Sequence, residues 1–302
     1  MAVRAATDDD MPAVRRIARR FDLLTGWPAE TDFLDAERAF GALLVSGEDD
    51  GEGGGAGGGA AGFGGTLRRG ALTHLGDLFV LPERQSSGTG RALLERLLAG
   101  DGPKVTFASS DPRAMALYVR RGLRPWTPLL YLSGPTAGLP AGSRVRAAGA
   151  REVAAADARA AGGARPGTLA WYAALPGVTV HVTVTAGTGG EAGWEAGGEA
   201  GGEAGYAFAR RLGREVLIGP AGGDSPDGCA RAVLGALAAV RGAVRAVDGA
   251  PQARLAVPGT HPLVPVLLGA GWRIGDMDTF MADDAALDLV RPDRYVPHPD
   301  LG

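Results

Sequence analysis

Residues 78–94, LFVLPERQSSGTGRALL, decide the fold of this chain. The apolar run 78–81 predicts a short buried strand that ends at Pro82, because proline cannot donate a ladder hydrogen bond. The polar turn 86–90 is rich in Ser and Gly, which tolerate unusual backbone angles and leave N–H groups uncovered. Leucines then recur at helical spacing within 93–98. Uncovered N–H groups at a helix start form an anion site, and phosphate is its usual guest.

The turn has the spacing Gln85-x-x-Gly88-x-Gly90. It differs from the dinucleotide-binding pattern, in which two glycines one residue apart are followed by a third. It also differs from the P-loop, because no lysine follows. Glycine-rich turns between a strand and a helix also occur without any ligand, so the turn alone leaves the anion open.

A second block, residues 111–123, reads DPRAMALYVRRGL and predicts a capped helix. Asp111 can cap the helix, and Pro112 suits its first position. Gly122 suits the residue just past its end. Tyr118 shares a helix face with the residue four positions earlier.

The two blocks, in this order, resemble the GCN5-related N-acetyltransferase (GNAT) family. The turn is similar to the family motif Q/R-x-x-G-x-G/A. The second block is similar to N-x-x-A-x-x-L/F-Y-x-x-x-G-F and departs from it at Asp111 and Leu123. The resemblance covers residues 1–133. It implies an α+β fold, with a mixed sheet between helical layers, and acetyl-CoA as co-substrate.

The resemblance also implies roles for individual residues. Tyr118 would be the general acid that protonates the departing thiolate. The amide of Val80 would polarise the thioester carbonyl, a contribution of about 10²–10³ in rate for enzymes of this type. The residues implied to hold the pyrophosphate and thioester arm of acetyl-CoA are Phe79, Val80, Gln85, Ser86, Ser87, Gly88, Thr89, Gly90 and Arg91.

The general base is less clear from the sequence. Many relatives use a glutamate on the central strand, and Gly76 stands at the matching position here. His74 lies on the same strand face as Gly76, because side chains alternate. We take His74 as the candidate base, with a water chain as an equal alternative. Asp77 is a weaker one, since it points to the other face unless a bulge intervenes.

The composition narrows the function classes. The chain has 302 residues, 45% of them hydrophobic, which is enough for a sizeable core. Its formal net charge of −3 gives no reason to expect a nucleic acid or an anionic membrane as a partner. The single cysteine, Cys229, excludes an intrachain disulfide framework and fits a reducing cytoplasm.

The sequence gives no sign of a membrane segment or a leader. Residues 1–10 run into an acidic stretch, unlike a signal peptide. No apolar run approaches the ~20 residues needed to span a bilayer. We therefore expect a cytoplasmic protein, a monomer or homodimer, that holds no metal and acts on an amine of a small molecule or a protein.

Both halves of the chain show the order strand, helix, strand, glycine-rich loop, strand. The sequence therefore predicts two tandem GNAT-like domains, residues 1–135 and 143–290, followed by an extended tail, 291–302. The glycine-rich loops, 47–62 and 186–205, are predicted to be mobile, because they offer little apolar surface to bury.

The second half lacks the features of the anion site. Pro226 and Asp224 stand where the first half has Gly88 and Ser86, so an N–H is lost and a carboxylate takes the place of a pyrophosphate. Leu267 stands at the position of the aromatic acid. We expect this half to be a degenerate domain that serves as scaffold, pocket wall or dimer surface.

The sequence thus predicts an acetyl-CoA-dependent N-acetyltransferase that transfers acetyl directly to a primary amine in a ternary complex. The alternative is an acyl-CoA-binding sensor or interaction module without transferase activity, which the missing strand glutamate favours. A nucleotide-binding protein is disfavoured by the missing lysine.

Overall fold

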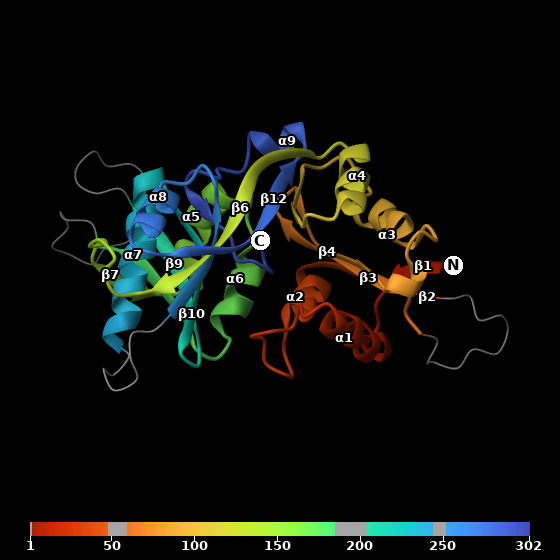
Figure 1. The fold of residues 1–302 in the computed structure, drawn as a ribbon, viewed down its shortest axis with the longest axis horizontal. Helices are drawn as coiled ribbons and strands as arrows, with labels where there is room; N and C mark the ends of the chain where they lie inside the picture. The colour runs from red at the N-terminus through yellow and green to blue at the C-terminus, as the bar shows by residue number, and fades with distance from the viewer. Residues whose placement is uncertain (1, 48–58, 185–203, 244–251) are drawn as a thin grey trace.

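A single continuous sheet runs through the whole molecule (Figure 1). The computed structural model describes residues 2–47, 59–184, 204–243 and 252–302. The mobile loops predicted from the sequence fall mainly outside these residues. The strand order is β1-β2-β3-β4-β5-β12-β6-β11-β10-β9-β8-β7, and β13 pairs with β10.

The first half contains β1 (Ala2–Ala5), η1 (Asp8–Asp10), α1 (Met11–Arg20), α2 (Phe33–Phe40), β2 (Gly41–Gly47), β3 (Gly62–Arg69), β4 (Leu72–Val80), η2 (Pro82–Arg84), α3 (Thr89–Leu97), β5 (Lys104–Ala108), α4 (Pro112–Arg120) and β6 (Arg124–Pro135). The second half contains β7 (Val145–Ala148), α5 (Ala150–Ala161), α6 (Pro166–Ala173), β8 (Val178–Thr183), β9 (Gly205–Leu212), β10 (Glu215–Gly223), α7 (Pro226–Ala243), β11 (Gln252–Pro258), α8 (Leu263–Gly269), β12 (Arg273–Ala282), α9 (Asp284–Leu287) and β13 (Tyr295–Val296).

The two sequence blocks fold as their residues require. β4 ends at Val80, directly before the short η2 turn that Pro82 begins. The carboxylate of Asp111 caps α4 by accepting from the amide of Arg113 at 2.8 Å. Gly122 follows α4 with a φ of +86°, a conformation that favours glycine.

The leucines of α3 form the core of the first half. Leu93, Leu94 and Leu97 are buried and pack with Leu75 of β4. Met281 of β12 joins the same cluster, although it lies in the second half of the sequence. Each fully buried side chain of this kind contributes about 1.5–3 kcal/mol to folding.

The two halves exchange a strand. β4 pairs in parallel with β5, and β10 pairs in parallel with β11. However, the antiparallel neighbour of β5 is β12, and that of β11 is β6. β6 and β12 also pair with each other in the middle of the sheet (Figure 1). A cut between the halves would therefore leave each without a strand that completes its sheet.

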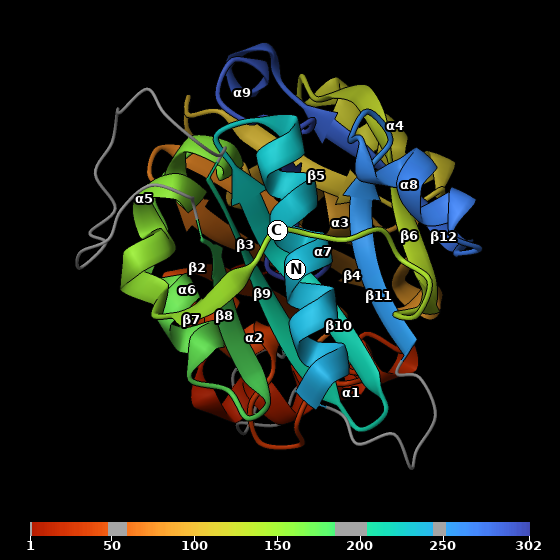
Figure 2. The same cartoon turned by 90° about the vertical axis from the view of Figure 1, so that its left-hand side faces the viewer.

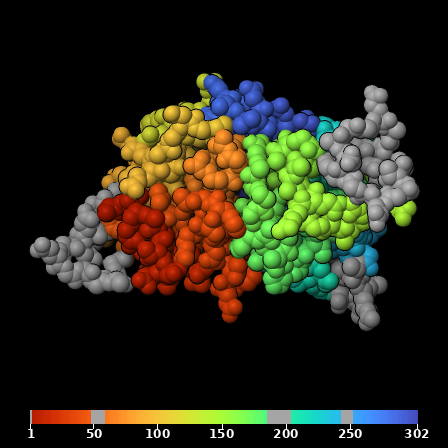
Figure 3. Space-filling view, turned by 180° about the vertical axis from the view of Figure 1, so that it is seen from behind, coloured from red at the N-terminus to blue at the C-terminus, as the bar shows by residue number. Residues whose placement is uncertain are grey.

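Helices cover both faces of the sheet, as the sequence predicts. α3 and α4 cover one face of the first half, and α1 and α2 cover the other (Figure 1). In the second half α7 packs on β9 and β10 (Figure 2). One core cluster joins α1 and α2 to α5 and α6, so the halves meet along a shared seam (Figure 3).

The tail is buried at this seam. β13 pairs with β10, with Val296 opposite Ala221, and the chain ends near the centre of the molecule (Figure 1). Arg165 anchors the tail, since it donates to the carbonyl of Leu301 at 2.9 Å and to the Tyr295 hydroxyl at 2.7 Å. The sequence predicts an extended tail but not its burial.

Candidate active site

β4 and β5 separate part-way along their length. They pair in parallel up to Leu75 and Thr106 and no further. β4 continues to Val80 and stays paired with β3, while β5 continues beside β12. Residues 76–80 therefore have a strand on one side only, and the other side opens into a V-shaped gap.

The backbone of Val80 faces this gap. The amide of Leu81 donates to the carbonyl of Ala61 at 3.0 Å, so that neighbouring position bonds toward β3. Hydrogen-bonded and non-hydrogen-bonded pairs alternate in antiparallel sheets, so the N–H and C=O of Val80 point away from β3. Consistent with this, the Val80 carbonyl accepts from Nε2 of Gln85 at 3.1 Å.

The side chain of Phe79 lies on the face of the sheet away from the turn. Its ring packs on Phe21 and Phe63, with centroids 5.1 and 5.8 Å away. These contacts place the Phe79 side chain on the face that carries α1, away from the turn.

The turn before α3 keeps an uncovered helix start. Ser86 and Gly88 have φ values of +63° and +89°, and Gly88 is the N-cap without a side-chain cap bond. The first bond inside α3 runs from the amide of Ala92 to the carbonyl of Gly88, at 3.0 Å. The amides of Gly90 and Arg91 precede it, so neither has an acceptor within this helix.

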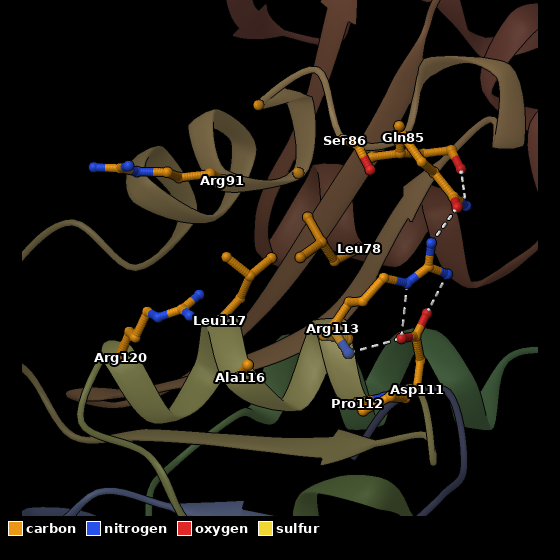
Figure 4. A pocket seen from close by; sticks show the side chains of 14 residues that line it. Leu78, Gln85, Ser86, Arg91, Asp111, Pro112, Arg113, Ala116, Leu117 and Arg120 are labelled. Atoms are coloured by element: carbon orange, nitrogen blue, oxygen red, sulfur yellow. Dashed lines mark hydrogen bonds and ion pairs between the residues drawn. The ribbon is translucent and has the colours of Figure 1, made fainter.

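A cavity of about 540 Å³ lies between this turn and α4 (Figure 4). Its lining residues are Leu78, Val80, Gln85, Ser86, Gly88, Gly90, Arg91, Asp111, Pro112, Arg113, Ala114, Ala116, Leu117 and Arg120. Most residues that the sequence assigns to the cofactor are among them. Phe79, Ser87 and Thr89 are not. The Ser87 hydroxyl instead donates to the carbonyl of Arg84 at 2.6 Å.

The cavity is cationic. Arg91, Arg113 and Arg120 line it against the single carboxylate of Asp111. Arg113 donates to Oε1 of Gln85 and to Oδ2 of Asp111, both at 2.8 Å (Figure 4). This bridge lowers the pKa of Asp111.

Two of these arginines, Arg113 and Arg120, were not predicted from the sequence as site residues. Residues 113, 117 and 120 fall on one helix face at spacings of four and three, and all three line the cavity. That spacing was the signal that could have found Arg113 and Arg120.

Tyr118 lies on α4 and is buried, with 6% of its surface exposed. It packs in the cluster of α3 leucines and Met281. Burial first, and then the charges of Asp77 and Asp111, raise its pKa above the usual value of a phenol. The phenol therefore keeps its proton at neutral pH.

His74 is buried beneath the tail. Its Nδ1 lies 2.9 Å from Nη2 of Arg69, and its ring contacts Phe107 at a centroid distance of 4.7 Å. Burial, and then Arg69 and Arg165, lower its pKa well below the usual value, so the ring is neutral. It lines neither the cationic cavity nor the acidic cavity described below.

A bulge brings Asp77 to the face of His74. The register of β3 and β4 shifts so that Gly65 lies opposite Asp77, and Gly76 becomes the extra residue. Beyond the bulge the alternation of side chains is reversed. The condition under which the sequence analysis admits Asp77 as a base is therefore met.

Comparison with known proteins rests on structure alone. No family model matches the sequence, and no curated protein matches it. A candidate acetyltransferase from Pyrococcus horikoshii superposes with a TM-score of 0.68 at 16% identity and covers 100% of this chain and 95% of its own.

Two further structures agree with it. A GCN5-related N-acetyltransferase from Kribbella flavida has a TM-score of 0.55 at 15% identity, with 93% and 71% of the two chains covered. A tandem GNAT protein from the clavulanic acid biosynthesis pathway has a TM-score of 0.54 at 17% identity, with 94% and 98% covered. The fold is that of the GCN5-related N-acetyltransferases. The tandem GNAT arrangement expected from the sequence is confirmed at the level of fold.

The second GNAT-like half closes its corresponding gap. β10 and β11 pair in parallel only up to Leu217 and Arg254. Beyond that point β13 pairs with β10, at Ala221 and Gly222, and also contacts β11. The tail thus occupies the place that is open in the first half.

The helix that follows this second gap, α7, has a side-chain cap, unlike α3. The amide of Gly228 donates to Oγ of Ser225 at 3.0 Å. The Asp224 carboxylate, in front of the helix, accepts from Arg159 at 2.9 Å. A capped helix start beside a carboxylate is a poor anion site.

A second cavity, of about 530 Å³, lies between the two GNAT-like halves. It is formed by β6, β11, β12, the loop after α1 and the tail, and its charged residues are Asp22, Asp276, Asp278, Asp300 and Arg254. Asp278 accepts from the Tyr131 hydroxyl at 2.7 Å, and Asp300 accepts from Trp27 at 2.8 Å. Burial raises the pKa of Asp300 to about 6. We call this the acidic cavity.

Within the described residues, no group of three or more His, Cys, Asp and Glu side chains is placed to hold a metal ion. Among the described helices, none combines the length and apolar character needed to cross a membrane.

Proposed function

We propose that this protein is an acetyl-CoA-dependent N-acetyltransferase whose first half, residues 1–135, binds the cofactor and catalyses transfer. The observation that carries the proposal is the open gap between β4 and β5, which continues into a cationic cavity at an uncovered helix start. A diphosphate joined to a long thioester arm matches both parts.

The cofactor roles follow from this geometry. The amides of Gly90 and Arg91, together with Arg113 and Arg120, would hold the pyrophosphate. The amide of Val80 would donate to the thioester carbonyl and then to the oxyanion that forms on it. Preorganised donors of this kind contribute about 10²–10³ to the rate.

Transfer would be direct. The nitrogen of a primary amine attacks the thioester carbonyl, a tetrahedral intermediate forms, and the C–S bond breaks. Tyr118 would return a proton to the departing thiolate, since the phenol is protonated at neutral pH. The acceptor would be a small molecule or a protein amine that enters through the acidic cavity, whose negative charge attracts an ammonium group.

The second half, residues 143–290, would bind no cofactor. Its gap holds β13, and its helix start is capped. It would serve as one wall of the acidic cavity and as the source of β12.

Calorimetry tests the cofactor part of the proposal. We expect acetyl-CoA to bind at one site per chain, and desulfo-CoA to compete for it. ATP should compete far more weakly, because it has no thioester arm. Absence of acetyl-CoA binding, or equal competition by ATP, contradicts the proposal.

The exchange of Tyr118 for Phe tests the chemistry. With any amine that wild type acetylates, we expect Tyr118→Phe to lower kcat by about 10²–10⁴ and to leave acetyl-CoA affinity unchanged. Cofactor binding without transfer to any amine of a broad panel would instead favour the sensor alternative.

A further inference from the structure

Glu37 of α2 fills the space of the missing strand glutamate. A Cβ atom at Gly76 would lie 2.5 Å from Oε1 of Glu37, and a Cβ at Gly65 would lie 1.7 Å from Oε2. Only glycine fits at both positions while this carboxyl is present. The carboxyl thus lies on the sheet directly beside the bulge that turns Asp77 to the same face.

Glu37 has no conventional hydrogen-bond donor. It is 0% exposed, and among the described residues no N–H or hydroxyl donates to either of its oxygens. Its carboxyl lies at Gly65, which is opposite Asp77 in the register of β3 and β4, so the two carboxyl groups are neighbours. A contact between two carboxyl groups is a hydrogen bond only when one of them carries a proton. Two carboxyls in one dry site cannot both ionise easily, so the pair holds one proton between them.

Asp77 is the more exposed member of the pair, although it lines neither cavity. It retains 8% exposure, whereas Glu37 has none. It also follows Gly76, the first residue of β4 beyond the last pair with β5, so it stands at the opening of the gap. Because the thioester is expected in this gap, Asp77 stands close to where an acceptor nitrogen must arrive.

We propose that Glu37 and Asp77 form a carboxyl pair that shares one proton, and that Asp77 is the general base that deprotonates the acceptor ammonium group. Glu37 is a positioning residue that acts through Asp77. This inference rests on the proposed acetyltransferase function.

The surrounding charges favour this arrangement. Asp32 at the start of α2 and Asp300 in the tail face the pair. The charge of Asp77 also raises the pKa of the Tyr118 phenol on α4. His74, on the same strand face, is neutral. Burial first, and then Asp300 and Asp32, raise the pKa of Asp77 to about 7, against the lowering effect of the hydrogen bond with Glu37. This makes it a stronger base than an ordinary aspartate by about 10³ in equilibrium constant.

The acceptor ammonium group loses one proton to Asp77 before it attacks. One N–H bond of the acceptor ammonium breaks, its electron pair stays on nitrogen, and an O–H bond forms on the Asp77 carboxylate. The neutral amine then attacks the thioester carbonyl, and the thiolate leaves with a proton from Tyr118. No oxidant or further reactant is needed.

Infrared spectroscopy tests the shared proton without any substrate. We expect wild type at pH 8, above the pKa of Asp77, to show a protonated carboxyl band that Glu37→Gln removes and that Asp77→Asn only shifts, because burial keeps Glu37 protonated. Glu152→Gln, a matched exchange in the first turn of α5, should keep the band. If the wild-type band is absent, or survives in Glu37→Gln, the pair is not as proposed.

Kinetics tests the base. With an amine that wild type acetylates, chosen from a diamine, a polyamine and a peptide α-amine, we expect Asp77→Asn to lower kcat by about 10²–10⁴. We expect Glu37→Leu to move the acid limb of the kcat/KM profile to higher pH, because it removes the hydrogen bond that lowers the pKa of Asp77. A purely structural role would not move that limb.

The outcomes separate the two proposals. Wild type that binds no acetyl-CoA contradicts the proposed function, while the infrared experiment still decides the carboxyl pair. Variants that bind acetyl-CoA normally, with unchanged kcat in Asp77→Asn or an unmoved acid limb in Glu37→Leu, contradict the role of the pair and leave the acetyltransferase proposal intact.

Discussion

The two halves contain matching gaps with different contents. In the first half, β4 and β5 separate after Leu75 and Thr106, and the gap continues into a cationic cavity. In the second half, β10 and β11 separate after Leu217 and Arg254, and β13 occupies the gap. The same strand–helix unit can therefore present backbone groups to a ligand or bond them to its own chain. What decides is whether another segment pairs there.

The turns beside the two gaps also differ, and again the first half is the one more open to an anion. The turn before α3 has no side-chain cap at Gly88 and faces a cavity lined by arginines of α3 and α4, whereas the turn before α7 carries Asp224 and a Ser225 cap. Both differences support the proposal that the first half binds the cofactor and the second half does not. Four substitutions can break or sharpen this comparison.

The largest effect is expected at Arg165, which anchors the tail that fills the second gap. Arg165→Ala leaves the buried Asp157 without the bonds at 2.8 and 2.9 Å that it accepts from this guanidinium. Removing one member of a buried ion pair costs about 3–5 kcal/mol. We expect a loss of that size in the free energy of unfolding, measured by urea denaturation.

The matched control is the surface pair of Arg159 and Asp224, in which both side chains are nearly half exposed. Arg159→Ala should cost less than about 1 kcal/mol. Equal losses for both variants would mean that the tail is not held by Arg165.

The next effect concerns the strand that the second half lends to the first. Met281 of β12 is fully buried among the α3 leucines. We expect Met281→Ala to lower the free energy of unfolding by about 2–5 kcal/mol in a single cooperative transition. Met277→Ala, on the same strand but 55% exposed, should change it by less than about 0.5 kcal/mol. Two separate transitions would contradict the sharing of a core.

A smaller effect is expected from pH at the tail. The folded-state pKa of Asp300 is raised to about 6 by burial, above its unfolded value. Between those values the folded state binds more protons, so this residue lowers stability as pH rises from about 4 to 6. The cost above pH 6 is up to about 3 kcal/mol.

Asp300→Asn should remove this dependence, because an amide does not ionise, and its oxygen can still accept from Trp27. Comparison of urea denaturation at pH 4 and pH 7 for the two proteins isolates the Asp300 contribution. Equal pH dependence in both would contradict the raised pKa.

The smallest effect is expected from making the first turn resemble the second. Ser86 lines the cationic cavity with a φ of +63°, a conformation that Asp and Asn tolerate. A carboxylate there repels a pyrophosphate, so Ser86→Asp should weaken acetyl-CoA binding by about 10- to 100-fold in calorimetry. Ser86→Asn has the same shape without the charge and should bind nearly as wild type. Unchanged binding by Ser86→Asp would remove the argument from Asp224.

Local signals predicted most of the elements. The end of β4 just before Pro82 and the start of α3 at the end of the turn 86–90 match the sequence prediction, since turn residues and periodicity determine both. The cap at Asp111 and the break at Gly122 were likewise readable, because each depends only on neighbouring residues.

Long-range pairing was not predictable in the same way. β6 follows α4 and β12 follows α8, so by their order in the chain either strand could complete either half. The place of the tail depends on the gap between β10 and β11, which exists only after the sheet has formed.

The candidate site was predicted in part for a related reason. The turn residues were found through their own motif. The position of Asp77 depends on a bulge, and Glu37 reaches the sheet from a distant helix because Gly65 and Gly76 have no side chains. Two glycines in adjacent strands are a weak signal in a glycine-rich chain.

The exchange of strands between the halves affects how the chain folds during its synthesis. As synthesis proceeds from the N-terminus, β5 is complete at Ala108, yet β12, its antiparallel neighbour, begins only at Arg273. Until then that edge of β5 has no final partner, and a bare edge is a template for pairing with other chains. Such late closure slows folding and favours aggregation of nascent chains. Ribosome-bound intermediates of this protein are therefore expected to need chaperone protection until β12, in the last tenth of the chain, has emerged.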